Sequence, residues 1–324
     1  MRTPEVSIVI PVYNEEGGLA ALFDALYPAL DGMGRSYEVL FVNDGSRDRS
    51  AAILREQCQK RPDVTRVVLL AGNFGQHNAI LAAFSQSRGK VVVTLDADLQ
   101  NPPHEIPRLL AEIDNGHDYV GTIRAGRQDS LWRVLPSRML NRIRESTTRI
   151  RITDQGCMLR AYGRNVVDAV NACPEMNTFI PALAYLFARS PTEITVSHAE
   201  REAGESKYSF YSLLRLNFDL MTGFSIVPLQ VFSLLGVIVS FLSLGLFALL
   251  VVRRLVVGAE VEGVFTLFAI AFFLIGILLA GVGLLGEYVG RIYTQVRARP
   301  RYRIEAVLAP GDGRSGADDR PEQA

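Results

Sequence analysis

Lys90-Val-Val-Val-Thr-Leu-Asp-Ala-Asp-Leu-Gln100 is the stretch on which the interpretation of the whole chain depends. Residues 90–95 form a short apolar run rich in β-branched side chains, and two carboxylates follow it at once. Buried strands of parallel sheets appear in sequences as continuous apolar runs of this kind. The stretch therefore predicts a buried strand whose carboxyl end carries Asp96 and Asp98.

The same pattern recurs through the first 200 residues, where segments with helical periodicity, such as Glu15–Leu30 and Ser50–Lys60, separate the apolar runs. The other strand-like runs are Val6–Val12, Tyr37–Val42, Val64–Leu70 and Asp118–Ile123. Alternation of strands and helices is typical of a parallel sheet with helices on both faces. We therefore expect an α/β domain with a Rossmann-like, mostly parallel sheet over residues 1–205.

Polar segments follow four of the predicted strands, at the edge of the sheet where open α/β folds bind ligands. These segments are Pro11–Glu15, Asn43–Ser46, Asn73–His77 and Asp96–Gln100. Carboxylates repel phosphate groups, so such a crevice suits a phosphate ligand only when a divalent cation is also bound. Asp96 and Asp98, with Gln100 as a further oxygen donor, have the hard-ligand chemistry that suits Mg²⁺ or Mn²⁺.

Each of these residues also has a structural interpretation. Asp98 or Asn101 could cap a helix that begins at Pro102-Pro103. Asp44 could belong to an Asp-Gly turn rather than bind a nucleobase or ribose. His77 could be a ligand or a base, but its neighbours also fit the start of a helix.

The C-terminal part of the chain contains two long apolar segments of the kind found in membranes. Leu229–Val252 and Val264–Gly286 run for 24 and 23 residues without a charge. A helix of about 20 apolar residues crosses the hydrocarbon core of a bilayer. Because the connector Arg253–Gly263 is short, residues 227–290 are predicted to form a transmembrane hairpin.

Basic residues flank both outer ends of this hairpin, whereas the connector pairs two arginines with two glutamates. The positive-inside rule then predicts that the α/β domain and the tail 291–324 are cytoplasmic. Residues 131–151 and 206–226 mix apolar and basic side chains, which predicts two helices in the membrane interface. The alternative is helices packed on the globular domain with solvated arginines. Beyond about residue 310 the polar tail is expected to be disordered.

Composition excludes several classes of function. The net charge is zero, which gives no sign of a nucleic-acid partner. The three cysteines show no paired spacing, which favours a reducing compartment and argues against a zinc site. The N-terminus also lacks the apolar core of a signal peptide.

The chain resembles family 2 glycosyltransferases, inverting enzymes of the GT-A fold, in Val9-Ile-Pro-Val-Tyr-Asn-Glu15, the Asn43-Asp-Gly-Ser46 turn and the Asp-x-Asp pattern. Asp96-Ala-Asp-Leu-Gln-Asn-Pro-Pro103 narrows the resemblance to polyprenyl-phosphate sugar synthases, the group that includes dolichol-phosphate mannose synthase. Further segments are similar to bacterial undecaprenyl-phosphate 4-deoxy-4-formamido-L-arabinose transferases. Among them are Asn73-Phe-Gly-Gln-His77, Gly121-Thr-Ile-Arg124, Arg127-Gln-Asp-Ser130, Gly156-Cys-Met-Leu-Arg-Ala-Tyr162, Ala199-Glu-Arg-Glu202, Gly204-Glu-Ser-Lys-Tyr-Ser209 and Gly283-Leu-Leu-Gly-Glu-Tyr-Val-Gly-Arg-Ile-Tyr293.

This resemblance implies a UDP-sugar donor, an undecaprenyl phosphate acceptor, and a Mg²⁺ or Mn²⁺ cofactor. It also implies a homotetramer in the bacterial inner membrane that serves lipid A modification, lipopolysaccharide biosynthesis and polymyxin resistance. The family often has Asp-Asp-Gly where this chain has Asn43-Asp44-Gly45.

The site residues that follow from pattern and resemblance fall into three groups. The nucleotide group is Pro11, Tyr13, Glu15, Asp44, Asn73 and Asp96, and the metal group is Asp96, Asp98 and Gln100. The acceptor-phosphate group is Arg124, Arg127, Arg133, Arg201 and Lys207, because arginine forks suit phosphate. Asp98, Arg124 and Arg201 are the residues expected to act in catalysis.

Three alternatives remain at this point. The first is a polyprenyl-phosphate synthase for glucose or mannose. The second is a processive polysaccharide synthase, which the sequence disfavours because the Gln-x-x-Arg-Trp motif of that group is missing around Trp132, the single tryptophan. The third is a non-catalytic membrane scaffold, which would have no need to keep the polar strand ends.

Overall fold

The computed structural model describes residues 3–125, 150–175, 179–197, 218, 222, 225–257, 264–297 and 299–309. The chain divides into two compact units. One, the sheet unit, comprises residues 1–131, 150–206 and 299–324, and the other, the helical unit, comprises residues 132–149 and 207–298. The chain thus passes from the sheet unit into the helical unit and back twice.

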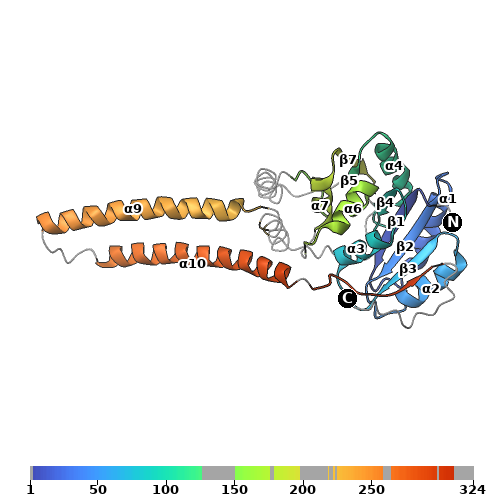
Figure 1. The fold of residues 1–324 in the computed structure, drawn as a ribbon, viewed down its shortest axis with the longest axis horizontal. Helices are drawn as coiled ribbons and strands as arrows, with labels where there is room; N and C mark the ends of the chain where they lie inside the picture. The colour runs from blue at the N-terminus through green and yellow to red at the C-terminus, as the bar shows by residue number, and fades with distance from the viewer. Residues whose placement is uncertain are drawn as a thin grey trace, which may run out of the picture. The chain divides into compact units, whose positions relative to one another are not determined.

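The sheet unit contains one eight-stranded sheet in the order β7-β5-β6-β4-β1-β2-β3-β8 (Figure 1). Its strands are β1 Val6–Val12, β2 Tyr37–Asn43, β3 Thr65–Leu70, β4 Val91–Thr94, β5 Tyr119–Arg124, β6 Arg160–Gly163, β7 Pro191–Val196 and β8 Ile304–Leu308. Parallel pairs join β1 to β2 and β4, β2 to β3, and β5 to β7. The pairs β3–β8, β4–β6 and β5–β6 are antiparallel. The predicted mostly parallel sheet is confirmed.

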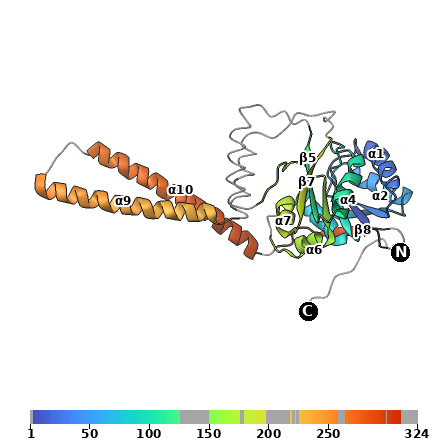
Figure 2. The ribbon, with the colours of Figure 1, turned by 90° about the horizontal axis from the view of Figure 1, so that it is seen from above.

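Helices cover both faces of this sheet. They are α1 Leu19–Asp31, α2 Ser50–Lys60, α3 Gln76–Gln86, the short 3₁₀ helix η1 Pro103–Glu105, α4 Ile106–Asp114, α6 Arg164–Ala172 and α7 Ile180–Phe187. Buried side chains of α1, α2 and α4 share one hydrophobic core with the central strands. In Figure 2, α6 and α7 lie on the side of the sheet away from α1 and α4. Among the described residues, helices therefore cover both faces, and the strand ends are where the polar segments lie.

Three strands were not predicted from the sequence. The strand β6 is four residues long and contains a buried arginine, so it lacks the apolar run that marks β1 to β4. The strand β7 begins with proline and is only half-buried, as expected of a sheet edge. The strand β8 lies beyond the predicted hairpin and pairs with β3, where the Ala71 amide donates to the Arg303 carbonyl at 2.9 Å.

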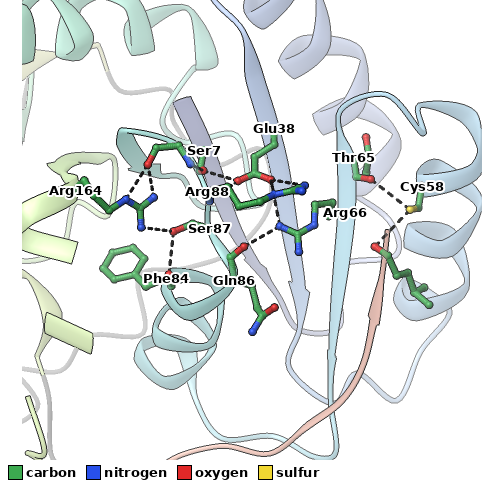
Figure 3. A network of polar contacts seen from close by, with 12 residues as sticks. Ser7, Glu38, Cys58, Thr65, Arg66, Phe84, Gln86, Ser87, Arg88 and Arg164 are labelled. Carbon is green, nitrogen blue, oxygen red and sulfur yellow. Dashed lines mark hydrogen bonds and ion pairs between the residues drawn. The ribbon is translucent and has the colours of Figure 1, made fainter. Parts of the chain in front are cut away.

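A polar network closes the amino ends of the central strands (Figure 3). The buried carboxylate of Glu38 accepts from the Ser7 hydroxyl and the Arg88 amide, both at 2.7 Å. The guanidinium groups of Arg66 and Arg88 each donate to its other oxygen at 3.2 Å. Arg164 extends the network to the Gly89 carbonyl and the Ser87 hydroxyl. A buried carboxylate with this many donors is a structural element of the fold.

The helical unit has two long apolar helices, α9 Val227–Val257 and α10 Val264–Val296. Both are long and apolar enough to cross a membrane, over Val227–Leu246 and Ile270–Val296. The two helices contact each other where the ring of Phe232 occupies the space in which a side chain at Gly281 would stand. The Tyr288 hydroxyl donates to the Ser225 carbonyl at 2.8 Å. The helices extend beyond the predicted spans 229–252 and 264–286.

Candidate active site

The polar segments after β1 and β2 hold each other in place. The Asn14 amide donates to the Ser46 hydroxyl at 3.0 Å, and the Asn14 side chain accepts from the Arg47 amide at 2.8 Å. The Glu15 amide donates to the Ser50 hydroxyl at 2.9 Å. Asn14 has a φ of +55°, a left-handed conformation that asparagine tolerates better than most residues. These bonds fix the loop that carries Tyr13, whose side chain is exposed.

Asp44 organises the next loop. Its carboxylate accepts from the amides of Phe74 and Gly75, at 2.7 and 2.9 Å, and the residue is buried. Burial raises the pKa of Asp44, and these two hydrogen bonds oppose that rise. The carboxylate predicted to bind a nucleobase or ribose therefore has a structural task as well: it holds the segment that presents the exposed Asn73.

The turn after Asp44 requires glycine at position 45 because of its backbone conformation and close neighbours. Its φ is +66°, and a Cβ atom there would overlap the backbone of Gly72 and lie 2.6 Å from the Asn73 nitrogen. The turn after β2 and the loop after β3 are thus in backbone contact. Since Pro11 lies in β1, next to β2 in the sheet, the nucleotide residues predicted on these three strand ends share one edge.

Asp96 and Asp98 follow β4 at that same edge, because Thr94 of β4 pairs with Val9 of β1 in parallel register. The Asp96 carboxylate accepts from the Gln76 side chain at 2.7 Å, and Asp98 accepts from the Gln100 amide at 3.2 Å. Leu99, which lies between Asp98 and Gln100, has a φ of +58°, which is strained for a bulky side chain. Strain of this kind persists where the surroundings enforce it, often at functional sites.

The electrostatics of this pair suit a cation. Burial, and next the charge of Asp98, raise the pKa of Asp96 to about 7, against the hydrogen bond from Gln76 and the charges of Arg124 and Arg160. A divalent cation would relieve the repulsion between the two carboxylates. Within the described residues, no group of three His, Cys, Asp or Glu side chains could hold a metal by itself. Two carboxylates and the Gln100 amide oxygen fit Mg²⁺ or Mn²⁺, which take other oxygens from water and substrate phosphates.

Arg124, predicted for the acceptor phosphate, ends β5 at this edge and has a carboxylate partner. Its Nε and Nη2 donate to the two carboxylate oxygens of Asp154, at 2.7 and 2.9 Å. Asp154 is buried, while about a quarter of the Arg124 side chain, 27%, is exposed. The pairing, with burial opposing it, keeps the pKa of Asp154 below its usual range. Sequence reasoning missed Asp154, which lies outside every predicted strand end.

Two further polar side chains, those of Arg160 and His77, lie near this edge of the sheet. The guanidinium of Arg160 is fully buried beside Thr94, its partner in the β4–β6 ladder. Burial, and next the charge of Arg160, lower the pKa of His77 to about 4, so His77 is neutral at neutral pH. Within the described residues its Nδ1 has no hydrogen-bond partner, and its ring meets Phe179 edge-on at 5.2 Å.

Several predicted residues lie outside the described part of the chain. They are Arg127, Arg133, Arg201 and Lys207. Most of the two predicted interfacial helices, 131–151 and 206–226, and the tail beyond residue 309 also lie outside it. Their roles stay predictions.

Residues 7–170 match glycosyl transferase family 2. The fold is similar to glucosyl-3-phosphoglycerate synthase from Mycobacterium tuberculosis in complex with Mn²⁺, uridine diphosphate and phosphoglyceric acid, at 16% identity. That similarity covers 68% of this chain and 76% of that one, with a TM-score of 0.49. The fold of this chain is also similar to Staphylococcus aureus TarS 1–349 in complex with UDP-GlcNAc, at 18% identity. That similarity covers 67% of this chain and 66% of that one, with a TM-score of 0.42.

Proposed function

The chain belongs to glycosyl transferase family 2, and we propose that it transfers 4-deoxy-4-formamido-L-arabinose from UDP to undecaprenyl phosphate at a membrane surface. One observation carries the proposal: Asp96 and Asp98 meet the loops after β1, β2 and β3 at one sheet edge, in a chain that also has two long apolar helices. The choice of sugar rests on the motif resemblance.

The donor side of the site is built from loops that are already fixed. Asp44 and Gly45 hold the backbone of residues 72–75, so Asn73 can meet a nucleotide without an ordering cost. Tyr13 is exposed at the neighbouring strand end and offers a ring and a hydroxyl. Asp96, Asp98 and Gln100 would hold the cation, which supplies Lewis-acid stabilisation of the leaving diphosphate.

The acceptor side needs charge neutralisation more than a base. A phosphate monoester has its second pKa near about 6, so the nucleophilic oxygen is largely ionised at neutral pH. Arg124 ends β5 at the site edge and would orient that phosphate together with Arg127, Arg133, Arg201 and Lys207. Attack in a single displacement inverts the anomeric centre.

The two long helices supply the reason for a lipid acceptor. The chain passes into the helical unit after residue 131 and again after residue 206, and it returns to the sheet unit at residues 150 and 299, so four crossings of the chain connect the two units. If α9 and α10 cross the bacterial inner membrane with both flanks cytoplasmic, the site stays close to phosphate groups of the inner leaflet. We propose this topology and a homotetrameric assembly. Protease protection in sealed vesicles tests the topology, and native mass measurement tests the assembly.

The decisive experiment incubates the purified full-length protein with undecaprenyl phosphate, Mn²⁺ and a panel of nucleotide sugars. We expect a single lipid-linked product that carries formamido-arabinose, identified by mass spectrometry. Glucose or mannose in the product would replace the sugar assignment and leave the lipid acceptor in place. Failure of every donor, with no Mn²⁺-linked stabilisation by UDP, would favour the scaffold.

A further inference from the structure

Arg160 is a buried cation that, among the described residues, donates hydrogen bonds to neutral acceptors. Its Nε donates to the Cys157 carbonyl at 2.8 Å, and its Nη2 donates to the Asp154 carbonyl at 2.6 Å. Its Nη1 donates to the Tyr119 hydroxyl. Burying a charge costs free energy even when every donor is satisfied. A neutral residue of similar volume would avoid that cost, so the guanidinium calls for an explanation beyond packing.

One of the three bonds made by Arg160 reaches β5, and the other two reach the segment that carries Asp154. This segment is fastened at further points, because the Thr94 hydroxyl donates to the Met158 carbonyl and Cys157 Sγ contacts Asn101 Oδ1 at 3.3 Å. Asn101 follows directly on the Asp96–Gln100 stretch. The Asp154 segment is thus tied both to β4 and to the chain just beyond the metal candidates.

Asp154 in turn determines where Arg124 points. Besides the two side-chain bonds, its carboxylate accepts from the Arg124 amide at 3.3 Å and from the Gly156 amide at 3.1 Å. Gly156 leaves the room that the pair needs, since a Cβ there would lie 2.9 Å from Arg124 Nη2. The Arg124 fork is therefore held on one edge by the carboxylate of Asp154, a residue whose backbone carbonyl is in turn held by Arg160.

We propose that Asp154 and Arg160 are positioning residues, which act through Arg124 to aim its guanidinium at the acceptor phosphate. Arg160 fixes the backbone of Asp154, and Asp154 fixes the fork of Arg124. The inference rests on the proposed function, because it assigns Arg124 to the acceptor. Preorganised arginine clamps of this kind increase rates by holding reactants in line.

A double-mutant cycle tests the proposal. Arg124→Ala, Asp154→Asn and the double variant are compared in the full-length protein for acceptor KM, donor KM and UDP binding with Mn²⁺. We expect Asp154→Asn to raise acceptor KM on the order of tenfold, with donor KM and UDP affinity unchanged. In the Arg124→Ala background, Asp154→Asn should add nothing, because residues that act through one group are not additive.

Arg160→Met should resemble Asp154→Asn, and Arg160→Lys should recover only part of the loss, since a lysine cannot make the three directed bonds. Gly156→Ala, which retains every polar group, should also raise acceptor KM by crowding Arg124. Arg164→Met is the matched control: this arginine also bonds a backbone carbonyl, at the opposite edge of the sheet, and its loss should leave acceptor KM unchanged.

The outcomes separate the two proposals. If Arg124→Ala raises acceptor KM and Asp154→Asn has the same effect with or without Arg124, Asp154 acts independently and the positioning inference is overturned. If Asp154→Asn and Arg160→Met lower the melting temperature but change acceptor KM no more than Arg164→Met does, their role is only structural and the inference is again overturned. If Arg124→Ala leaves acceptor KM unchanged in an enzyme that transfers sugar, the acceptor assignment fails first.

Discussion

The carboxylates at the two ends of the central strands have opposite surroundings. At the amino end, Glu38 accepts from the hydroxyl of Ser7, an amide and two guanidinium groups (Figure 3). At the carboxyl end, Asp96 lies beside a second carboxylate and has a pKa raised to about 7, by burial first and then by Asp98. The Glu38 carboxylate thus has cationic partners within the fold, whereas Asp96 forms no ion pair with any of the described residues.

The difference shows how stability and function are divided within one sheet. Donors that surround a carboxylate stabilise its ionised form, and removal of either partner leaves a costly buried group. A carboxylate pair without close cations is unfavourable until a cation arrives, which is what a cofactor site requires. The strained backbone of Asn14 and Leu99 lies at the carboxyl end as well. The active edge is therefore assembled at a cost that the rest of the fold must offset.

The largest expected effect is on catalysis at the carboxyl end. Asp98→Asn should lower kcat at least about a thousandfold, the scale of losing one preorganised electrostatic group, while the melting temperature changes by no more than a few degrees. Product formation and thermal unfolding measure the two quantities. The control is Asp63→Asn, an exposed carboxylate that pairs with Arg61. Near-normal turnover in Asp98→Asn would remove Asp98 from the metal group.

At the amino end the same kind of change should act on stability. Glu38→Gln leaves the buried guanidinium of Arg66 without its carboxylate, and loss of one partner of a buried ion pair costs about 3–5 kcal/mol. We expect a large drop in melting temperature, with donor and acceptor KM unchanged in the protein that remains folded. The matched control is Glu56→Gln, on the exposed side of α2. A variant that melts like the wild type would contradict a structural role for Glu38.

Gly45→Ala should affect both stability and nucleotide binding. Its Cβ would meet the backbone of Gly72, and its φ of +66° is unfavourable for alanine by about 1–2 kcal/mol. The loop after β3 must shift, so we expect weaker UDP binding together with a lower melting temperature. Gly34→Ala is the control, since Gly34 has a φ of +70° but nothing within 4 Å of its Cβ position. Equal UDP affinity in the two variants would show that the Gly45 contact does not set the nucleotide loop.

The carboxyl-end site could largely be predicted from the sequence, because its residues lie next to the strands that position them. The strands β1 to β4 are continuous apolar runs, and each polar segment after them follows directly in the chain. The sequence therefore predicts that Asp44, Asp96 and Asp98 lie at one edge of the sheet. The carboxylate role of Glu38 was not predicted, because its partners Ser7, Arg66 and Arg88 lie 28 to 50 residues away in the chain.

Partners that are distant in the chain also explain which residues of the site were not predicted. Arg124 was predicted to meet a phosphate from its place at a strand end, yet its partner Asp154 is 30 residues away in an irregular segment. Arg160 stands in a strand too short and too polar to be recognised, and only the β4–β6 register shows that it lies beside Thr94. The strand β8 was hidden because it returns to the sheet after the long helices.

The smallest expected effect is on stability, and it has the opposite sign to that of Glu38→Gln: removal of the Asp96 carboxylate should stabilise the protein. Because the folded protein raises the pKa of Asp96 from 3.8 to about 7, it binds more protons than the unfolded chain between these values. The free energy of unfolding therefore falls as pH rises through this window. Asp96→Asn removes the penalty, so the metal-free variant should be more stable than the wild type at pH 8, by on the order of 1 kcal/mol. Below about pH 3, where Asp96 is neutral in both the folded and the unfolded protein, the difference should vanish.

Melting temperatures in EDTA at pH 5 and pH 8 measure this difference, and added Mn²⁺ provides the internal control. Mn²⁺ should raise the wild-type melting temperature and reduce the advantage of Asp96→Asn, because a cation bound to the ionised carboxylate stabilises only the folded state. Glu38→Gln should stay less stable than the wild type at pH 8, with or without the metal. A destabilised Asp96→Asn at pH 8 would mean that Asp96 is a structural carboxylate like Glu38, and the distinction between the two ends of the sheet would not hold.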